Sequence, residues 1–323
     1  MPDSPPILPS LDFALAHAKR LLFSPINKKK WLCLALPAVL VCVGEGGTEY
    51  LMWAEVAAFR YKADTIIDWI TQNTSSFLSI MTGATLVACV FYILYRYINS
   101  RARFMLMDYV ITGQSGFSAA WKRYRQQGNA LMKLRIYWDL AIFNVLLLIV
   151  VVAAALAWPD FHQFLNSTTG EYEITFWSRL AIIFLLLAIP LALIFVWLAA
   201  CTFFFMAIPV MYITHMPPWP AYKYVLTRIF FPHLKSCLLY FLMMTAVQMA
   251  LVIAGNLALL LIALLTCLTG YILYCIPVLN ILPNYLISTL ILPLTACEQT
   301  FALRFMEQFT PNFQLPWPAP KRT

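Results

Sequence analysis

Long apolar stretches, separated by gaps of alternating charge, constrain this chain more than any other feature. A bilayer core about 30 Å thick needs roughly 20 apolar residues of helix. The composition, 62% hydrophobic and 11% charged, leaves too little polar surface for a water-soluble protein. We therefore predict an all-α fold, a polytopic bundle of about six transmembrane helices. The predicted spans are Trp31–Gly44, Phe77–Tyr97, Trp138–Trp158, Phe176–Ile213, Ser236–Ile276 and Leu286–Phe305.

Two of the predicted spans are too long for one straight crossing. The fourth contains Pro190 and Pro209, which can kink a helix or end it. The fifth contains Gly255-Asn256, so it is either one bent helix that projects from the membrane or two spans joined by a tight turn. Six spans and seven spans are therefore both compatible with the apolar pattern, and charge has to decide between them.

Lys and Arg gather in every second gap, which predicts an orientation. They are concentrated before the first span, between the second and third, between the fourth and fifth, and in the tail at Lys321-Arg322. Because basic loops stay in the cytoplasm, the N-terminus is expected there. Six spans also return the basic tail to the cytoplasm, whereas seven would export it, so we favour six.

Amphipathic helices are predicted between the spans. Three lie on the cytoplasmic side, with apolar stripes that begin at Leu11, Phe117 and Tyr222, and one lies outside, from Met52 to Ile70. Helices of this kind lie in the membrane interface and bury one apolar face. The basic residues of the inner helices suit an anionic leaflet, at roughly 1 kcal/mol for each cation.

The inner helices also indicate a threefold repeat of helix hairpins. Pro25, Gly128 and Pro232 each end one of them just before an outgoing span. The units would cover residues 1–105, 106–215 and 216–310 within a single integral membrane domain, 1–323. Since the sequence identity between units is slight, a chance likeness remains the alternative.

Short motifs along the whole chain resemble an uncharacterised family of bacterial multi-pass membrane proteins. They are Ala16-x-x-Lys19-Arg20-Leu21-Leu22-Phe23-x-Pro25, Lys30-Trp31, Gly44-Glu45-Gly46-Gly47, Ser100-Arg101-Ala102-Arg103-Phe104-x-x-x-Asp108, Ile208-Pro209-Val210-Met211, Leu290-x-x-Pro293 and Phe305-x-x-Gln308-Phe309-x-Pro311. That family is distantly similar to the membrane domain of some glycerophosphodiester phosphodiesterases, whose soluble catalytic domain has no counterpart here. The resemblance implies a bacterial inner (plasma) membrane and an architecture, but no chemistry.

Two groups of residues are candidates for a site. A basic group after the second span could bind lipid phosphate, because arginine offers a bidentate fork: Arg101, Arg103, Lys122, Arg123 and Arg125. A second group is polar at membrane depth, where polar side chains form interhelical hydrogen bonds or an ion or proton site: Glu45, Gln248, Asn256 and Glu298. Packing is the commoner role for such residues.

The sequence holds no recognisable catalytic constellation. His, Cys and acidic residues lack the spacing of a metal site, and no nucleophile or phosphate-loop motif occurs. We expect no metal and no cofactor. The net charge of +8 is explained by topology and lipid contact, so no nucleic-acid role is assigned.

Three classes of function are compatible with these features. The favoured one is a non-enzymatic module that organises a protein partner or lipids, chiefly anionic ones, at the cytoplasmic face. The alternative is a transporter or channel for a small molecule or lipid, in which Gln248, Asn256 and Glu298 would share a wet cavity. A lipid-modifying enzyme is the third class, and it lacks visible catalytic residues.

Overall fold

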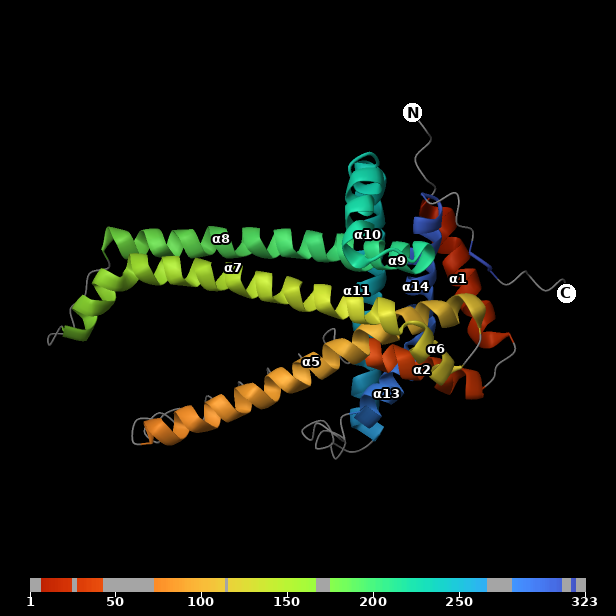
Figure 1. Ribbon diagram of the computed structural model, residues 1–323, viewed down its shortest axis with the longest axis horizontal. Helices are drawn as coiled ribbons and strands as arrows, with labels where there is room; N and C mark the ends of the chain where they lie inside the picture. The colour runs from red at the N-terminus through yellow and green to blue at the C-terminus, as the bar shows by residue number, and fades with distance from the viewer. Residues whose placement is uncertain are drawn as a thin grey trace.

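The computed structural model consists of a helical body from which long apolar helices extend (Figure 1). It describes residues 7–24, 28–42, 73–113, 116–166, 175–265, 281–309 and 315–317. These residues form helices α1 (Ile7–Phe23), α2 (Lys28–Cys42), α5 (Thr74–Thr112), α6 (Phe117–Arg123), α7 (Arg125–Asn166), α8 (Phe176–Cys201), α9 (Ile208–Thr214), α10 (Pro218–Tyr224), α11 (Leu234–Leu265), α13 (Ile281–Leu290) and α14 (Leu292–Glu307), with wider π-helical segments η1 (Thr202–Ala207) and η2 (Val225–Phe230).

Helices α5 and α7 each have one part with exposed apolar side chains and another part with buried side chains. At 1.5 Å of rise per residue, the 39 residues of α5 extend roughly 60 Å, about twice the thickness of a bilayer core. Side chains 78–94 of α5 are exposed, whereas those from Asn99 to Ile111 are buried. We call the exposed apolar helical segments the arms, and the part that buries residues 99–111 of α5 the body.

The body holds the main hydrophobic core of the described structure. Its centre consists of the buried C-terminal half of α5, the segment Met206–Ile213, and α14. Helix α1 packs along α14, so the first and last described helices lie side by side. A Pro at the start of α14 and a left-handed Gly113 after α5 fix two of the helix ends, since Gly adopts that backbone conformation without steric cost.

Among the residues that the structure describes, four helical segments are long and apolar enough to cross a membrane. They are Thr74–Thr112, Arg125–Trp158, Phe176–Thr214 and Leu234–Ala258. The second to fourth predicted spans fall within the first three of these segments, and the predicted fifth span, Ser236–Ile276, overlaps the last one. α7 and α8 pair as a hairpin arm, α5 leaves the body in another direction, and α11 runs across both in Figure 1.

The two outermost predicted spans differ from the prediction. α2 ends at Cys42, has Pro37 inside it, and packs beside the buried half of α5 rather than along the arm. The predicted sixth span, Leu286–Phe305, is interrupted at Ile291, because Pro293 cannot continue the hydrogen bonding of α13. The resulting α14 lies buried in the body.

The structure decides between the alternatives that the sequence left open for the two longest predicted spans. The chain stays helical from Phe176 to Thr214 through Pro190 and Pro209, with the π-helical η1 between them. α11 continues through Gly255-Asn256 to Leu265, so a tight turn at that pair is wrong. The remainder of the predicted fifth span lies outside the described residues.

Candidate functional site

A buried polar layer lies where the arms join the body, and Asn99 of α5 is at its centre. The Asn99 side chain is fully buried, and its amide donates hydrogen bonds to the carbonyl oxygens of Leu40 (3.1 Å) and Val41 (2.8 Å). These carbonyls belong to the last turn of α2, where helical partners are lacking. Arg135 of α7 donates to Oδ1 of the same asparagine. One side chain therefore connects α2, α5 and α7.

Two arginines of the layer share an aromatic partner. The guanidinium groups of Arg103 and Arg135 lie over the ring of Phe204 in η1, 4.9 Å and 4.7 Å from its centroid. Both arginines are more than nine-tenths buried. A ring face attracts a cation more strongly when water is excluded, so Phe204 stabilises charge that would otherwise be costly to bury.

Glu298 extends the polar layer into α14. Its carboxylate accepts a hydrogen bond from Gln248 of α11, and Arg103 is close enough to interact with it electrostatically. The structure thus brings together two of the four predicted polar residues. Asn256 is exposed, and its amide donates to Val252 of its own helix. Glu45 lies outside the described residues.

Arg101 joins α5 to the short helix α6. Its guanidinium lies 4.1 Å from the centroid of the Tyr97 ring and 4.9 Å from that of Trp121, and it donates to Oδ1 of Asn129 at 2.9 Å. Only 3% of the residue is exposed. A lipid phosphate would have to displace these partners to reach Arg101, and it would meet the same obstacle at the buried Arg103.

Asp108 is the acidic centre of a second cluster, nearer the end of α5. It accepts a hydrogen bond from the Tyr212 hydroxyl at 3.2 Å and pairs with Arg123 at 3.4 Å. Burial, together with the nearby carboxylate, raises the pKa of Tyr124. A hydrogen bond with Tyr124 and the charge of Asp108 raise the pKa of Arg123. The phenol and the guanidinium therefore keep their protons at neutral pH, and the cluster behaves as a fixed connection between helices.

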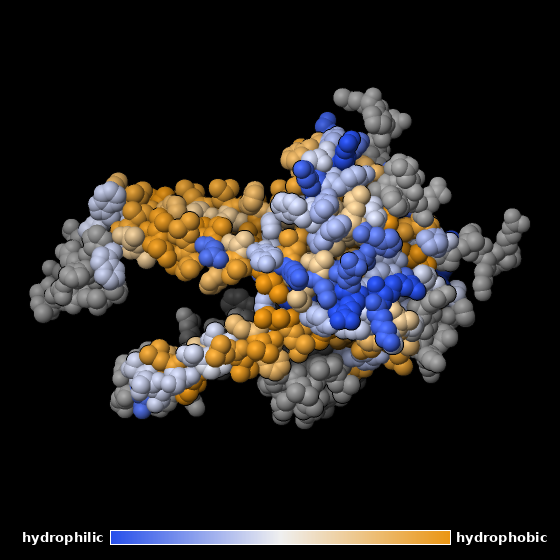
Figure 2. Space-filling model, viewed as in Figure 1, coloured by the Kyte–Doolittle hydropathy of each residue, from blue (hydrophilic) through white to orange (hydrophobic). Residues whose placement is uncertain are grey.

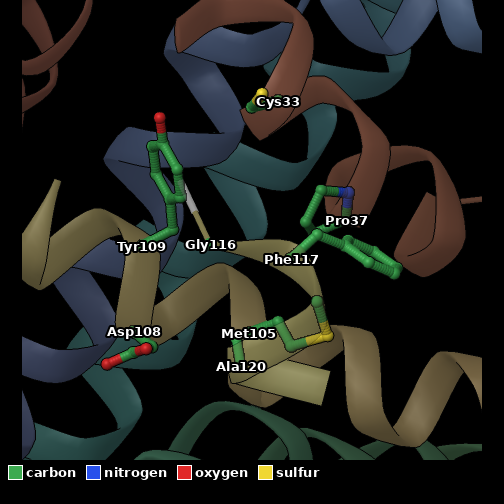
Figure 3. Close-up of a pocket in the computed structure, with 8 residues that line it drawn as sticks. All are labelled: Cys33, Pro37, Met105, Asp108, Tyr109, Gly116, Phe117 and Ala120. Carbon is green, nitrogen blue, oxygen red and sulfur yellow. The ribbon is translucent and has the colours of Figure 1, made fainter. Parts of the chain in front are cut away.

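A small cavity opens beside this cluster (Figure 3). It is lined by Cys33 and Pro37 of α2, Met105, Asp108 and Tyr109 of α5, and Gly116, Phe117 and Ala120 around α6. Its volume of about 20 Å³ holds roughly one water molecule, which is too small for a substrate. Within the described ranges, no three His, Cys, Asp or Glu side chains come together as a metal site.

The exposed charges of the body are almost all positive, and Figure 2 shows hydrophilic residues gathered on the face over α6 and the start of α7. Asp12 is the exposed carboxylate among the described residues of the body. The exposed cations are Lys19, Arg20, Lys122, Arg123, Arg125, Lys133, Lys223, Arg228 and Lys235. The predicted phosphate-binding group is thus divided: Lys122, Arg123 and Arg125 are on the surface, and Arg101 and Arg103 are inside.

Sequence reasoning missed Asn99, Arg135 and Phe204 as members of the polar layer. Asn99 ends an apolar run and resembles a residue that meets water, and Arg135 was counted among topology-setting cations. The available signal would have been a polar residue on the same helix face as Arg103, one turn away, as Asn99 is. Their burial depends on α2, α5, α7 and η1 meeting, which no local pattern shows.

Comparison with known proteins identifies a family and no activity. No curated protein and no solved structure matches the chain. The predicted resemblance to an uncharacterised family is confirmed, while the distant likeness to a phosphodiesterase membrane domain stays a prediction. The family model described as a family of unknown function, DUF7544, matches residues 7–308, and the chain, with its cationic body and apolar arms, belongs to that family.

Proposed function

We propose that the protein is a non-enzymatic membrane module that binds and organises anionic phospholipid at the cytoplasmic face. One observation carries the proposal: the exposed charges of the described body are cations apart from Asp12, and they lie at the base of helices whose side chains are apolar and exposed. Apolar helices of this length require a bilayer, which brings the basic body to the headgroup region.

Exposed apolar residues accompany these cations. Leu15 and Phe23 of α1, Phe117 of α6 and Trp219 of α10 are all exposed. Aromatic and aliphatic side chains beside cations are typical of helices in the interface, where the apolar group enters the acyl boundary. Because each basic residue near an anionic leaflet contributes about 1 kcal/mol, a few of them suffice to select the lipid.

The path of the chain supports six passes with both ends in the cytoplasm. Cys42 is in the body, whereas α5 begins at the far end of its arm, and α11 leaves the body before α14 lies within it. From these positions we infer that the chain leaves the body three times and returns three times. We infer an even number of crossings, which cysteine labelling from either side of the membrane would test. Labelling of the two termini on opposite sides would contradict it.

Lipid retention tests the proposed function directly. The protein would be reconstituted in nanodiscs of equal phosphatidylglycerol and phosphatidylcholine, extracted gently, and its retained lipids counted by native mass spectrometry. We expect phosphatidylglycerol to be retained preferentially, and the preference to weaken in a Lys122→Gln, Arg125→Gln variant. The matched control is Arg179→Gln, an exposed cation near the start of α8 on the hairpin arm. Equal retention of both lipids by the unmodified protein would refute the proposal.

Transport is the second candidate function, and the Gln248–Glu298 contact favours it. A carboxylate between α11 and α14, within reach of Arg103, is the arrangement that an ion- or proton-coupled carrier uses. Proteoliposomes loaded with a pH-sensitive dye test this. A carrier would dissipate an imposed pH gradient, and Glu298→Gln would abolish the flux. An unchanged gradient with both proteins would leave Glu298 as a packing residue.

A further inference from the structure

The order of the helices repeats three times along the chain. A first helix on the body precedes a second helix, and the helix that follows then ends inside the body. The first set is α1, α2 and α5; the second is α6, α7 and α8 with its continuation through η1 and α9; the third is α10 with η2, then α11, then α13 and α14. The break between α6 and α7 falls at Tyr124, and the prediction that Gly128 ends the middle inner helix is wrong, because Gly128 lies inside α7.

The returning helices of the first two sets end in the same way. Gly113 after α5 and His215 after α9 are the residues with positive φ in the described structure, at 66° and 56°. Each follows a threonine whose hydroxyl donates to the carbonyl four residues earlier, Thr112 to Asp108 and Thr214 to Val210. The returning helix of the third set ends differently: α14 stops at Glu307, and Gln308 after it has a φ of −65°. A left-handed residue after a helix is a common ending, so this likeness joins the first two sets only.

Packing between the sets forms a closed cycle. α5 contacts α6, η1 and α9 contact α10, and α14 contacts α1. The first two contacts join neighbours in sequence, but the third joins the two ends of the chain. Gln308 also donates to the Ser10 hydroxyl, and Trp317 lies edge-on to Phe13 and His17 of α1. Each returning helix therefore supports the first helix of the next set, and the last set supports the first.

Each first helix presents cations beside an exposed apolar side chain. In α1, Lys19 follows Leu15 by one helical turn. In the second set, Lys122 of α6 and Arg125 at the start of α7 follow Phe117. In the third set, Lys223 follows Trp219 by one turn, and Arg228 of η2 is exposed further on. Residues four apart lie on the same helix face, so a headgroup contact and an acyl contact coincide in the first and third sets. In the second set, Lys122 is five residues from Phe117 and Arg125 begins the next helix, so the two contacts are neighbours at the junction of α6 and α7.

From this placement we propose that the protein is a closed ring of three units, and that each unit presents one equivalent contact for an anionic phospholipid headgroup. The inference rests on the proposed lipid-binding function and adds a stoichiometry of three. It also assigns α1 and α10 the same role as α6, although the exposed members of the predicted phosphate-binding group, Lys122, Arg123 and Arg125, all belong to the middle unit.

Unit-specific charge removal, read by the same nanodisc experiment, tests the ring. The variants are Lys19→Gln with Arg20→Gln, Lys122→Gln with Arg125→Gln, and Lys223→Gln with Arg228→Gln. All six side chains are exposed, so the fold should persist, and the thermal unfolding midpoint verifies this. Lys→Arg and Arg→Lys versions keep the charge at each unit and control for packing. Arg179→Gln controls for loss of any cation.

We expect each variant to retain about one third less phosphatidylglycerol than the unmodified protein, and the combined variant to lose all preference. If one variant alone abolishes the preference, or if two of the three have no effect, the three contacts are not equivalent and the inference fails while the proposed function stands. If the unmodified protein shows no preference, the proposed function itself fails. A free-phosphate site is distinguished by competition: inorganic phosphate would displace the lipid from such a site but not from a leaflet contact.

Discussion

The arms and the body distribute the same kinds of residue in opposite ways. In the arms, apolar side chains face outward on all sides, and the most apolar window of α5 has none of its residues buried. In the body, Asn99, Arg101 and Arg135 are inside, while lysines cover the surface. Figure 2 shows the contrast as an apolar hairpin arm beside a hydrophilic face. The surroundings that each region meets, lipid or water, account for the difference.

The comparison also shows that the same polar residue type has different hydrogen-bond partners in the arms and in the body. Asparagines in the arms bond to their own helix, as Asn144 does to Leu140 and Asn256 to Val252, although the Tyr92 hydroxyl of α5 donates across to Asp139 of α7. A polar residue in the body bonds across helices, as Asn99 does to α2 and α7. Replacing the same amino acid is therefore expected to lower the free energy of unfolding in the body but not in the arms. Matched substitutions in the two regions measure this difference.

The largest difference is expected between two glycines. A Cβ at Gly128 would lie 2.5 Å from Cγ and 3.2 Å from Cα of Arg101, whereas one at Gly83 of the α5 arm meets nothing within 4 Å. Gly128→Ala should push α7 from α5 and lower the free energy of unfolding by about 3 kcal/mol. Gly83→Ala should leave it unchanged. Thermal unfolding in detergent compares them, and equal midpoints would mean that α5 and α7 do not cross at Gly128.

Asparagine provides the next comparison. Asn99→Ala removes the donor to two carbonyls of α2 and the acceptor for Arg135, so we expect a loss of about 2 kcal/mol in the free energy of unfolding. Asn256→Ala, in the exposed part of α11, should cost almost nothing. Chemical denaturation of both variants in mixed micelles measures the difference. A larger loss in the free energy of unfolding for the Asn256 variant than for the Asn99 variant would contradict the assignment of the polar layer to the body.

A smaller effect is expected where the C-terminal segment closes the body. Glu307 accepts hydrogen bonds from the Leu315 backbone N–H at 2.8 Å, the Trp317 indole at 2.9 Å and Arg304 at 2.6 Å. Glu307→Ala should lower the free energy of unfolding by about 1.5 kcal/mol and speed proteolysis of the tail. Asp12→Ala removes an exposed carboxylate of α1 as the control. An uncleaved tail in the Glu307 variant would show that these bonds do not hold it.

The smallest effect concerns ring stacking rather than charge. Arg101→Lys keeps the positive charge but loses the planar group between Tyr97 and Trp121, so α6 should dock less firmly, at a cost of about 1 kcal/mol. Arg179→Lys on the arm should be silent. Hydrogen exchange of α6 amides is the sensitive measurement. Unchanged exchange would mean that Asn129 and packing alone hold the helix.

The apolar runs alone were enough to place the second to fifth helices, because roughly 20 apolar residues in sequence have few alternatives to a membrane helix. They were not enough to find where those helices end. The segment between Tyr97 and Trp138 was interpreted as an interfacial helix and its flanks, yet α5 and α7 both continue through much of it. Arg101, Arg103 and Asp108 look like loop residues when read locally, since nothing in the sequence shows that neighbouring helices cover them.

The candidate site, like the helices, could be predicted only in part from the sequence. Lys122, Arg123 and Arg125 are exposed, as expected of a surface that meets lipid headgroups. Glu298 and Gln248 come together, but they are separated by 50 residues of chain, and only the packing of α11 against α14 brings them into contact.

The sequence by itself determined the all-α class, the long apolar helices and the concentration of basic residues in the segments between them, because these follow from local hydropathy and charge along the chain. The tertiary structure alone decided that α14 would be a buried helix beside α1, and that three arginines would lie inside, on aromatic rings and amides. The physical reason is that burying a charge requires partners from other helices, and which helices supply them is settled only when the chain packs.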